Sequence, residues 1–147
     1  MKPAPISLLE YFATDLSFSA NPNFAADRPT EIKEGEFDVD IRLQPAAKAP
    51  AEHRWQLTLE IKHQAAPETN FPYAFRMVLV GFFTAAATVK PEDEERTVKI
   101  HGASVLYGMA REIVRSVTGR GPHRPVMLPT VSFYEKSTNS APPVGQN

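Results

Sequence analysis

The chain has 147 residues, a length that suits one domain with its own core and is marginal for two. Its 16 basic and 17 acidic residues leave a formal charge of -1, which supplies no electrostatic footprint for nucleic acid or an anionic membrane. The absence of cysteine excludes disulfides, thiolate metal sites and cysteine nucleophiles. The longest apolar run, residues 77–83, is far short of the ~20 residues that span a bilayer. Since the N-terminus also lacks the apolar run of a signal peptide, we expect a cytoplasmic protein.

Three segments of the first half predict β-strands. Residues 6–18 are rich in β-favouring side chains, but their alternation fails around residues 13–15, so we predict one long or bulged strand. Residues 37–43 and 54–62 alternate apolar and polar side chains, which is typical of strands with one wet face. The short polar segment between them predicts a hairpin. The proline- and asparagine-containing residues 21–30 predict a crossing loop instead.

The next segment, residues 71–84, predicts a strand of another kind because residues 77–83 are apolar on both sides of the pleat. Either this strand is central in the sheet, or a second surface covers its other face. A domain of this size with one helix has little to cover both faces of a sheet. We therefore infer a partner subunit.

A helix is predicted after residue 104, with Ser104 as its N-cap. Its apolar side chains recur at the i, i+3, i+4 and i+7 positions of one buried face, namely Val105, Leu106, Met109, Ala110, Ile113, Val114 and Val117. Gly119 and Gly121 are expected to end the helix in a left-handed cap. A separate short helix is predicted over residues 92–100, where a proline and four acidic residues suit a helix start.

Three prolines, Pro122, Pro125 and Pro129, follow the predicted helix and hold the chain extended up to residue 133. A stiff apolar segment beside a sheet is suited to accepting extended apolar polypeptides with little demand on their sequence. We interpret this segment as one wall of a binding groove.

No catalytic or metal-binding motif is found in the sequence. His53 and His63 are ten residues apart in the chain, too far for one metal, and are interpreted as surface histidines, while His123 is interpreted as a solvated loop residue. No acidic residue stands where it would orient a histidine as a base. The acidic run 92–95 lacks the alternating ligands of a calcium loop. We predict a protein that is not an enzyme and that carries no cofactor or metal.

Residues 106–133 carry two motifs in order, LYGMAREIVRSVTGRG and PVMLPTVSF. Together they resemble the C-terminal signature of the SecB export chaperones: an L-(F/Y)-x-x-A-R-E helix, an R-G stop and an L-(P/A)-P-(I/V)-x-F segment. Residues 14–18 and 80–83 are similar to the family's first and last strands. The resemblance implies an α+β, SecB-like fold, in which a four-stranded antiparallel sheet packs with one long helix and four copies assemble as a dimer of dimers.

The resemblance also implies a function. The family consists of ATP-independent holdases that bind unfolded preproteins in apolar grooves and keep them export-competent. We assign a client-binding groove to seven residues: Phe12, Phe18, Tyr73, Met127, Leu128, Val131 and Phe133. We assign the interface of a homotetramer to Val105, Met109, Ile113 and Val117.

The chain departs from the family at its C-terminal end. Residues 1–135 are expected to form the chaperone domain and residues 136–147 a disordered tail, since that tail is neutral, contains proline and has almost no apolar side chain to bury. Family members continue into a second C-terminal helix with an acidic tail. That helix is expected to be short or missing here.

Two further departures concern the sheet and the helix. The family docks the export ATPase SecA on an acidic sheet surface, and Asp15 matches one acidic position of it. Ser19 and Arg76, however, stand where carboxylates are usual, which weakens an electrostatic dock. The family helix also has proline where Gly108 stands. These departures leave two other functions open: a SecB-like chaperone dedicated to a narrow client, such as the antitoxin of a toxin-antitoxin pair, and a structural adaptor without chaperone activity.

Overall fold

The structure, a computed structural model, describes residues 1–31, 36–46, 53–64 and 66–133. The elements along the chain are β1 (Ile6–Ala20), β2 (Asp38–Pro45), β3 (Arg54–His63), the short 3-10 turn η2 (Pro67–Thr69), β4 (Tyr73–Ala85) and α1 (Pro91–Thr118). The prediction of a disordered tail over residues 136–147 lies outside the described residues. Among the described residues, no helix is long and apolar enough to cross a membrane.

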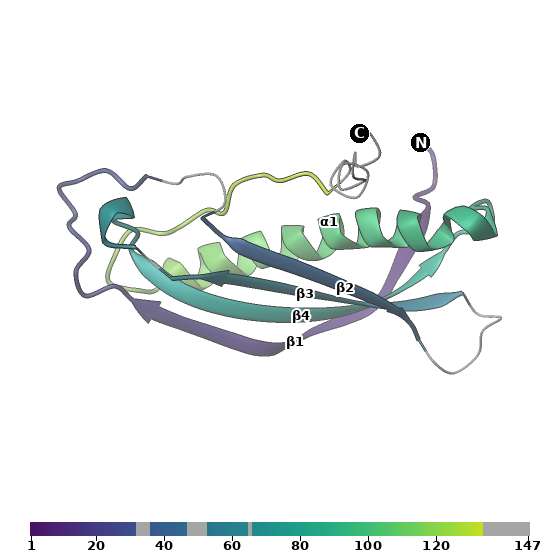
Figure 1. Cartoon of the computed structure of the whole chain (residues 1–147), viewed down its shortest axis with the longest axis horizontal. Coiled ribbons are helices and arrows are strands. Elements are labelled where there is room, and N and C mark those ends of the chain that lie inside the picture. The colour runs from purple at the N-terminus through teal and green to yellow at the C-terminus, as the bar shows by residue number, and fades with distance from the viewer. Residues whose placement is uncertain (32–35, 47–52, 65, 134–147) are drawn as a thin grey trace, which may run out of the picture.

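The four strands form one antiparallel sheet in the order β1-β4-β3-β2, and α1 lies along one face of it (Figure 1). This arrangement confirms the predicted α+β fold of four antiparallel strands and one long helix. Because β4 lies between β1 and β3, its apolar side chains are flanked by neighbouring strands on both sides. Val78 and Val80, which face away from α1, are buried in this way. The first explanation of the doubly apolar run, a central strand, is therefore the one observed.

The predicted irregularity of β1 is confirmed as two β-bulges. The register with β4 shifts between Leu8 and Glu10 and again between Ala13 and Asp15. Tyr11 and Leu16 are five residues apart, a spacing that would place them on opposite faces of a regular strand. The second bulge places Tyr11 opposite Gly81 and Leu16 opposite Met77, two β4 positions on the face that carries α1.

The single helix α1 corrects the prediction of two helices. Its N-cap is Lys90, with Pro91 in the first turn followed by three acidic residues that suit the positive end of the helix dipole. Ser104 lies in the helix interior, where its hydroxyl donates to the carbonyl of Ile100 over 3.1 Å. The predicted N-cap is wrong because nothing between residues 100 and 104 interrupts the helical hydrogen bonds.

The C-terminal end of α1 also differs from the prediction. Gly119 has φ -67° and ψ -13°, a right-handed conformation, so the left-handed cap is wrong. The N–H groups of Arg120 and Gly121 instead donate to the carbonyls three residues earlier, in a tightened last turn. Gly121 is needed for another reason: a Cβ atom there would collide with the ring and hydroxyl of Tyr73.

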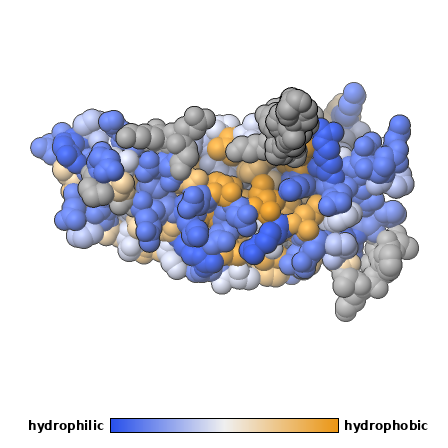
Figure 2. Space-filling view, viewed as in Figure 1, coloured by the Kyte–Doolittle hydropathy of each residue, from blue (hydrophilic) through white to orange (hydrophobic). Residues whose placement is uncertain are grey.

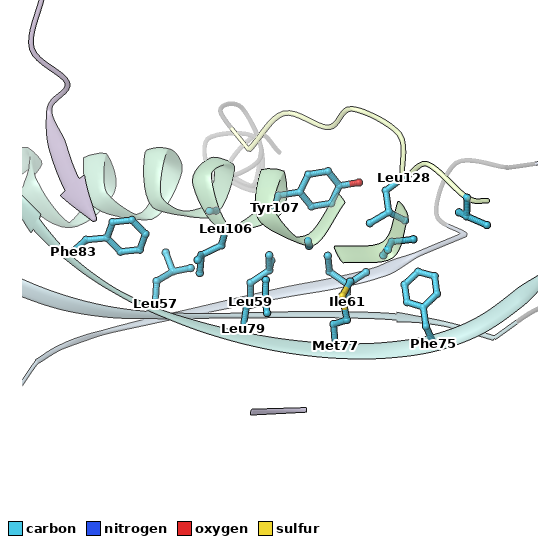
Figure 3. Close-up of a cluster of buried hydrophobic side chains, with 14 of the residues drawn as sticks. Leu57, Leu59, Ile61, Phe75, Met77, Leu79, Phe83, Leu106, Tyr107 and Leu128 are labelled. Atoms are coloured by element: carbon cyan, nitrogen blue, oxygen red, sulfur yellow. The ribbon is translucent and has the colours of Figure 1, made fainter. Parts of the chain in front are cut away.

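The core lies between α1 and the face of the sheet that it covers (Figure 3). Its largest fully buried side chains come from β3, β4 and the loop between them, the helix and the segment that follows it: Leu57, Leu59, Ile61, Phe71, Met77, Leu79, Phe83, Leu106 and Leu128.

Two histidines are less exposed than predicted: His63, interpreted as a surface residue, is buried, and His123, which does lie in a loop, is half-buried rather than solvated. His63 is only 2% exposed and packs among Phe37, Phe71 and Phe75, and its Nδ1 lies 3.2 Å from the carbonyl of Glu36. Burial in this aromatic cluster lowers the pKa of His63. His123 packs against Phe24 and Tyr73, with its Nε2 3.0 Å from the carbonyl of Asn21. Both histidines are covered by aromatic side chains that are distant from them in the sequence, so the local sequence did not indicate their burial.

The third histidine, His53, is exposed as expected, but it has a partner. Its Nδ1 lies 3.1 Å from the buried carboxylate of Glu94, which also accepts a hydrogen bond from Nε1 of Trp55 over 2.9 Å. These contacts join the beginning of β3 to the first turns of α1.

Candidate polypeptide-binding surfaces

An open apolar groove, here called the β1 groove, runs between β1 and α1. It has a volume of about 420 Å³ and is lined by Tyr11, Met109, Glu112, Ile113, Ser116 and Val117. Leu16 is on the same face of β1. Tyr11 and Leu16 are 42% and 49% exposed, which is high for side chains on the face of the sheet that carries the helix. A single chain therefore leaves this side of its helix uncovered.

The four residues predicted as a subunit interface fall along this side of α1. Val105 and Val117 are exposed, and Met109 and Ile113 are half-buried. The predicted helical face is thus divided: Leu106, Ala110 and Val114 pack into the core, while the other members stay open. The sequence reasoning missed Tyr11 and Leu16, although the broken alternation of β1 signalled that the two could share a face.

The C-terminal segment, residues 122–133, is fixed to α1 by side chains that bind its backbone. The hydroxyl of Tyr107 donates to the carbonyl of Pro129 over 2.7 Å, and Nε of Arg111 donates to the carbonyl of Leu128 over 3.0 Å. The N–H of Val126 donates to the hydroxyl oxygen of Thr118 over 2.9 Å. Burial raises the pKa of the Tyr107 phenol, so it remains a hydrogen-bond donor.

Adjacent residues of the C-terminal segment point in opposite directions. Leu128 is fully buried and projects into the core (Figure 3). Met127, in contrast, is 50% exposed, and Val131 is also exposed. Leu128 is therefore a core residue, which corrects its assignment to a client groove. An extended backbone alternates its side chains, so one neighbour docks while the other remains open.

The remaining predicted groove residues do not converge on one site. Tyr73 is buried, and its hydroxyl accepts from the N–H of His123 and donates to the carbonyl of Thr118, which again corrects a predicted client contact. Phe18 stacks on Phe75, and Phe133 packs edge-on against Tyr107. Phe12 lies on the opposite face of the sheet, where it contacts Phe82. The open members are thus Phe12, Met127 and Val131, with Phe18 and Phe133 half-buried.

Asp15 is held in an ion-pair cluster on the sheet face away from α1. The Arg76 guanidinium donates to the carboxylate of Asp15 on one side and to Oε2 of Glu60 on the other, the latter over 2.8 Å. One arginine on β4 thus links carboxylates of β1 and β3. No cluster of three or more acidic or histidine side chains suited to a metal occurs within the described part of the chain.

Exposed apolar side chains gathered on a surface mark sites of protein-protein contact. In Figure 2, hydrophobic side chains gather in the middle of the face that carries β2, between hydrophilic ends. With the β1 groove on the other side of α1, this places the chain among proteins that meet other polypeptides through apolar surface.

The chain belongs to the SecB family, since the family model described as preprotein translocase subunit SecB matches residues 2–139. A protein-export protein SecB of Rhodopseudomonas palustris (strain BisA53) is 29% identical over 131 residues, which cover 89% of this chain and 79% of the relative. Its counterpart in Rhodospirillum centenum is 24% identical over 131 residues, covering 89% and 76% of the two chains.

Two solved structures share the fold. The SecB-like chaperone of Mycobacterium tuberculosis, in complex with a ChAD peptide from the HigA1 antitoxin, has a TM-score of 0.50 and 20% identity over 87% of this chain and 91% of that one. A protein of unknown function from Streptococcus agalactiae has a TM-score of 0.53 and 13% identity over 88% of this chain and 100% of that one.

Proposed function

We propose that this chain is an export chaperone that holds unfolded preproteins without ATP in the cytoplasm, by binding rather than by catalysis. Membership of the SecB family supports this proposal. The observation that carries it is the apolar surface left open beside a well-packed core, above all Met127 and Val131 on the C-terminal segment. Surface of this kind is costly to leave in water and gains free energy when another polypeptide covers it.

The β1 groove is assigned to assembly. Its apolar side chains lie along α1 and β1, two elements long enough to pack against a second copy over a large area. We propose a homotetramer in which these surfaces are covered by other subunits.

The exposed side of the C-terminal segment is assigned to clients. Met127 and Val131 are open there, while Leu128 and the bonds from Tyr107 and Arg111 fix the backbone. A segment fixed in advance loses little conformational freedom on binding, so more of the apolar contact energy remains as affinity.

The direct test is suppression of aggregation. Three unrelated apolar proteins are unfolded in denaturant and diluted, without ATP, into a molar excess of this chain, and light scattering is followed. The proposal predicts slower aggregation for all three. Full-rate aggregation of all three would contradict it.

A second function, a chaperone dedicated to one client, is favoured by the pairing of Arg76 with Asp15 and Glu60. This pairing neutralises carboxylates that a basic docking partner would need. The fold is shared with a SecB-like chaperone bound to an antitoxin peptide, which makes an antitoxin the client class to try. Rescue of one antitoxin encoded beside this chain, with no effect on the three unrelated proteins, would favour the dedicated chaperone. If the chain neither rescued the antitoxin nor slowed the aggregation of the three unrelated proteins, a structural adaptor without chaperone activity would be the function that remains.

A further inference from the structure

We infer that the C-terminal segment selects its clients by charge and prefers apolar stretches that have an acidic residue on each side. This inference rests on the proposed function and deepens it, because it names a chemical class of client for the same surface. The two residues that carry it are Arg111 and Arg124, whose guanidinium groups are fixed beside the segment.

Arg111 and Arg124 flank the exposed side chain of Met127. The segment runs back along α1, so Arg111 on the helix reaches the carbonyl of Leu128 with its Nε (Figure 1). Arg124 belongs to the segment itself and stands three residues before Met127, which is roughly 10 Å of extended chain. A client that covers Met127 therefore lies between two positive charges.

Both guanidinium groups are held by uncharged partners. The Cζ of Arg124 lies 5.1 Å from the centre of the Phe24 ring, and its Nη2 donates to the hydroxyl oxygen of Thr30 over 2.9 Å. The partner of Arg111 is a backbone carbonyl. Within the part of the chain that the structure describes, neither group forms an ion pair with a carboxylate. Each charge is thus ordered in advance, and a client carboxylate can bind it with little further loss of side-chain freedom.

Two arginines of the sheet are held in the opposite way. Arg76 on β4 lies between the carboxylates of Asp15 and Glu60, and Arg42 on β2 forms an ion pair with Asp40 at 3.6 Å. The positive charges of these two arginines are neutralised within the chain. The charges beside the C-terminal segment are not, so they remain available to a partner.

The surroundings of the segment are also basic. Residues 105–133 contain four arginines and one acidic residue, and residues 21–31, the loop that Arg124 contacts, contain one arginine and two acidic residues. With histidine neutral, these two stretches together carry a formal charge of +2, although the whole chain carries -1. The local potential therefore attracts acidic clients and repels basic ones.

Three peptides that differ only in charge test the preference. Each is a dansyl-labelled ten-residue peptide in which the same four apolar residues are flanked on each side by one glutamate, one glutamine or one lysine. We expect wild type to bind the glutamate peptide at least about threefold more tightly than the glutamine peptide, and the lysine peptide at least about threefold more weakly. Raising sodium chloride from about 0.05 M to about 0.5 M should reduce both differences. Equal affinities for all three peptides at low salt would overturn the inference.

Three variants locate the preference, which is measured as the ratio of the affinities for the glutamate and glutamine peptides. Arg124→Gln should lower this ratio at least about twofold, whereas Arg124→Lys keeps the charge and should retain most of it. Arg96→Gln removes the same charge from an exposed position near the other end of α1 and should leave the ratio unchanged. A variant that merely loosens the segment weakens both peptides and does not change the ratio. Equal effects of Arg124→Gln and Arg96→Gln would show a response to net charge, and the inference would be wrong.

A second copy of this chain is the competing partner, because the first turn of α1 is acidic. That turn is a poor match for the arginines. Its Glu94 is buried and already bonded to His53 and Trp55, and three basic residues within residues 90–99 leave that stretch with a formal charge of -1. We expect Arg124→Gln to leave the mass measured by light scattering unchanged. A lower mass would show that a second copy uses Arg124, and the inference would be wrong.

The inference and the proposed function fail in distinguishable ways. If wild type suppresses aggregation but does not prefer the glutamate peptide, the inference is wrong while the proposed function stands. If wild type neither suppresses aggregation of the three unrelated proteins nor binds any of the peptides, the proposed function fails and this inference fails with it.

Discussion

Met127 and Leu128 are neighbours in the C-terminal segment, but one is exposed to solvent and the other packs in the core. Both are apolar and sit between prolines that keep the backbone extended. Such a segment has no helical period and no ladder register to indicate which side chain docks. The sequence therefore predicted its extended form, but not that Leu128 enters the core while Met127 remains open.

The first prediction compares these two residues. Leu128→Ala removes a fully buried side chain and should lower the free energy of unfolding by about 2–5 kcal/mol, since it loses apolar burial and leaves a cavity. Met127→Ala should change it by less than about 0.5 kcal/mol. Urea denaturation followed by circular dichroism measures both. Equal losses would contradict the opposite orientations of the two side chains.

The second prediction concerns pH. Burial lowers the pKa of His63 below its usual value of 6.5, so the unfolded chain takes up the proton more readily than the folded one. The free energy of unfolding is therefore unaffected by His63 above about pH 6.5, where the residue is neutral in both states. It decreases as the pH falls from there towards the lower pKa that His63 has in the folded protein.

The variant His63→Phe removes this titration. Between about pH 7 and pH 5, its free energy of unfolding should fall less steeply than that of wild type, by at most ~1.4 kcal/mol per pH unit. The slope is measured, so a constant difference in stability between the two proteins does not matter. Parallel curves over that range would show that His63 does not oppose protonation in the fold.

At the scale of the elements, periodicity predicted the strands and the long apolar face of α1. It could not place the start of α1, because Ser104 and Pro91 both suit a helix start and only tertiary packing decides between them. It also could not show that the predicted face is wider than the core: Leu106 and Val114 meet the sheet, while Val105 stays open. The seven residues predicted to form one groove lie on different surfaces, because an apolar pattern in the sequence does not show which part of the fold each side chain will contact.

The third prediction concerns the two glycines inside α1. Gly108 is exposed, and a Cβ atom there would meet nothing within 4 Å, so Gly108→Ala should raise the free energy of unfolding by about 0.5–1 kcal/mol through helix propensity. Gly102 is the matched control, because a Cβ atom there would lie 3.2 Å from the ring of Phe83. Gly102→Ala should yield no such gain. A gain at Gly102 and none at Gly108, in thermal melts, would contradict this packing.

For the whole molecule, a single chain folds around one core and leaves apolar surface on both sides of α1. The fourth prediction is that Ile113→Asp dissociates or unfolds the proposed homotetramer, because it buries an unpaired carboxylate in the β1 groove at a cost of several kcal/mol. Lys99→Asp, at an exposed position of the same helix, should leave the mass unchanged. Light scattering at micromolar concentration measures the mass. A monomeric wild type would refute the assembly.

The central claim is that clients are held by the exposed side of a C-terminal segment whose other side is fixed in the core. It is tested most directly by titrating one fluorescent unfolded client against wild type and the double variant Met127→Ser/Val131→Ser, with mass measured in parallel. Because both side chains are exposed, the assembly should remain intact, and binding should weaken by roughly 1–3 kcal/mol if the client desolvates both. Unchanged affinity in an assembly of unchanged mass would contradict the claim.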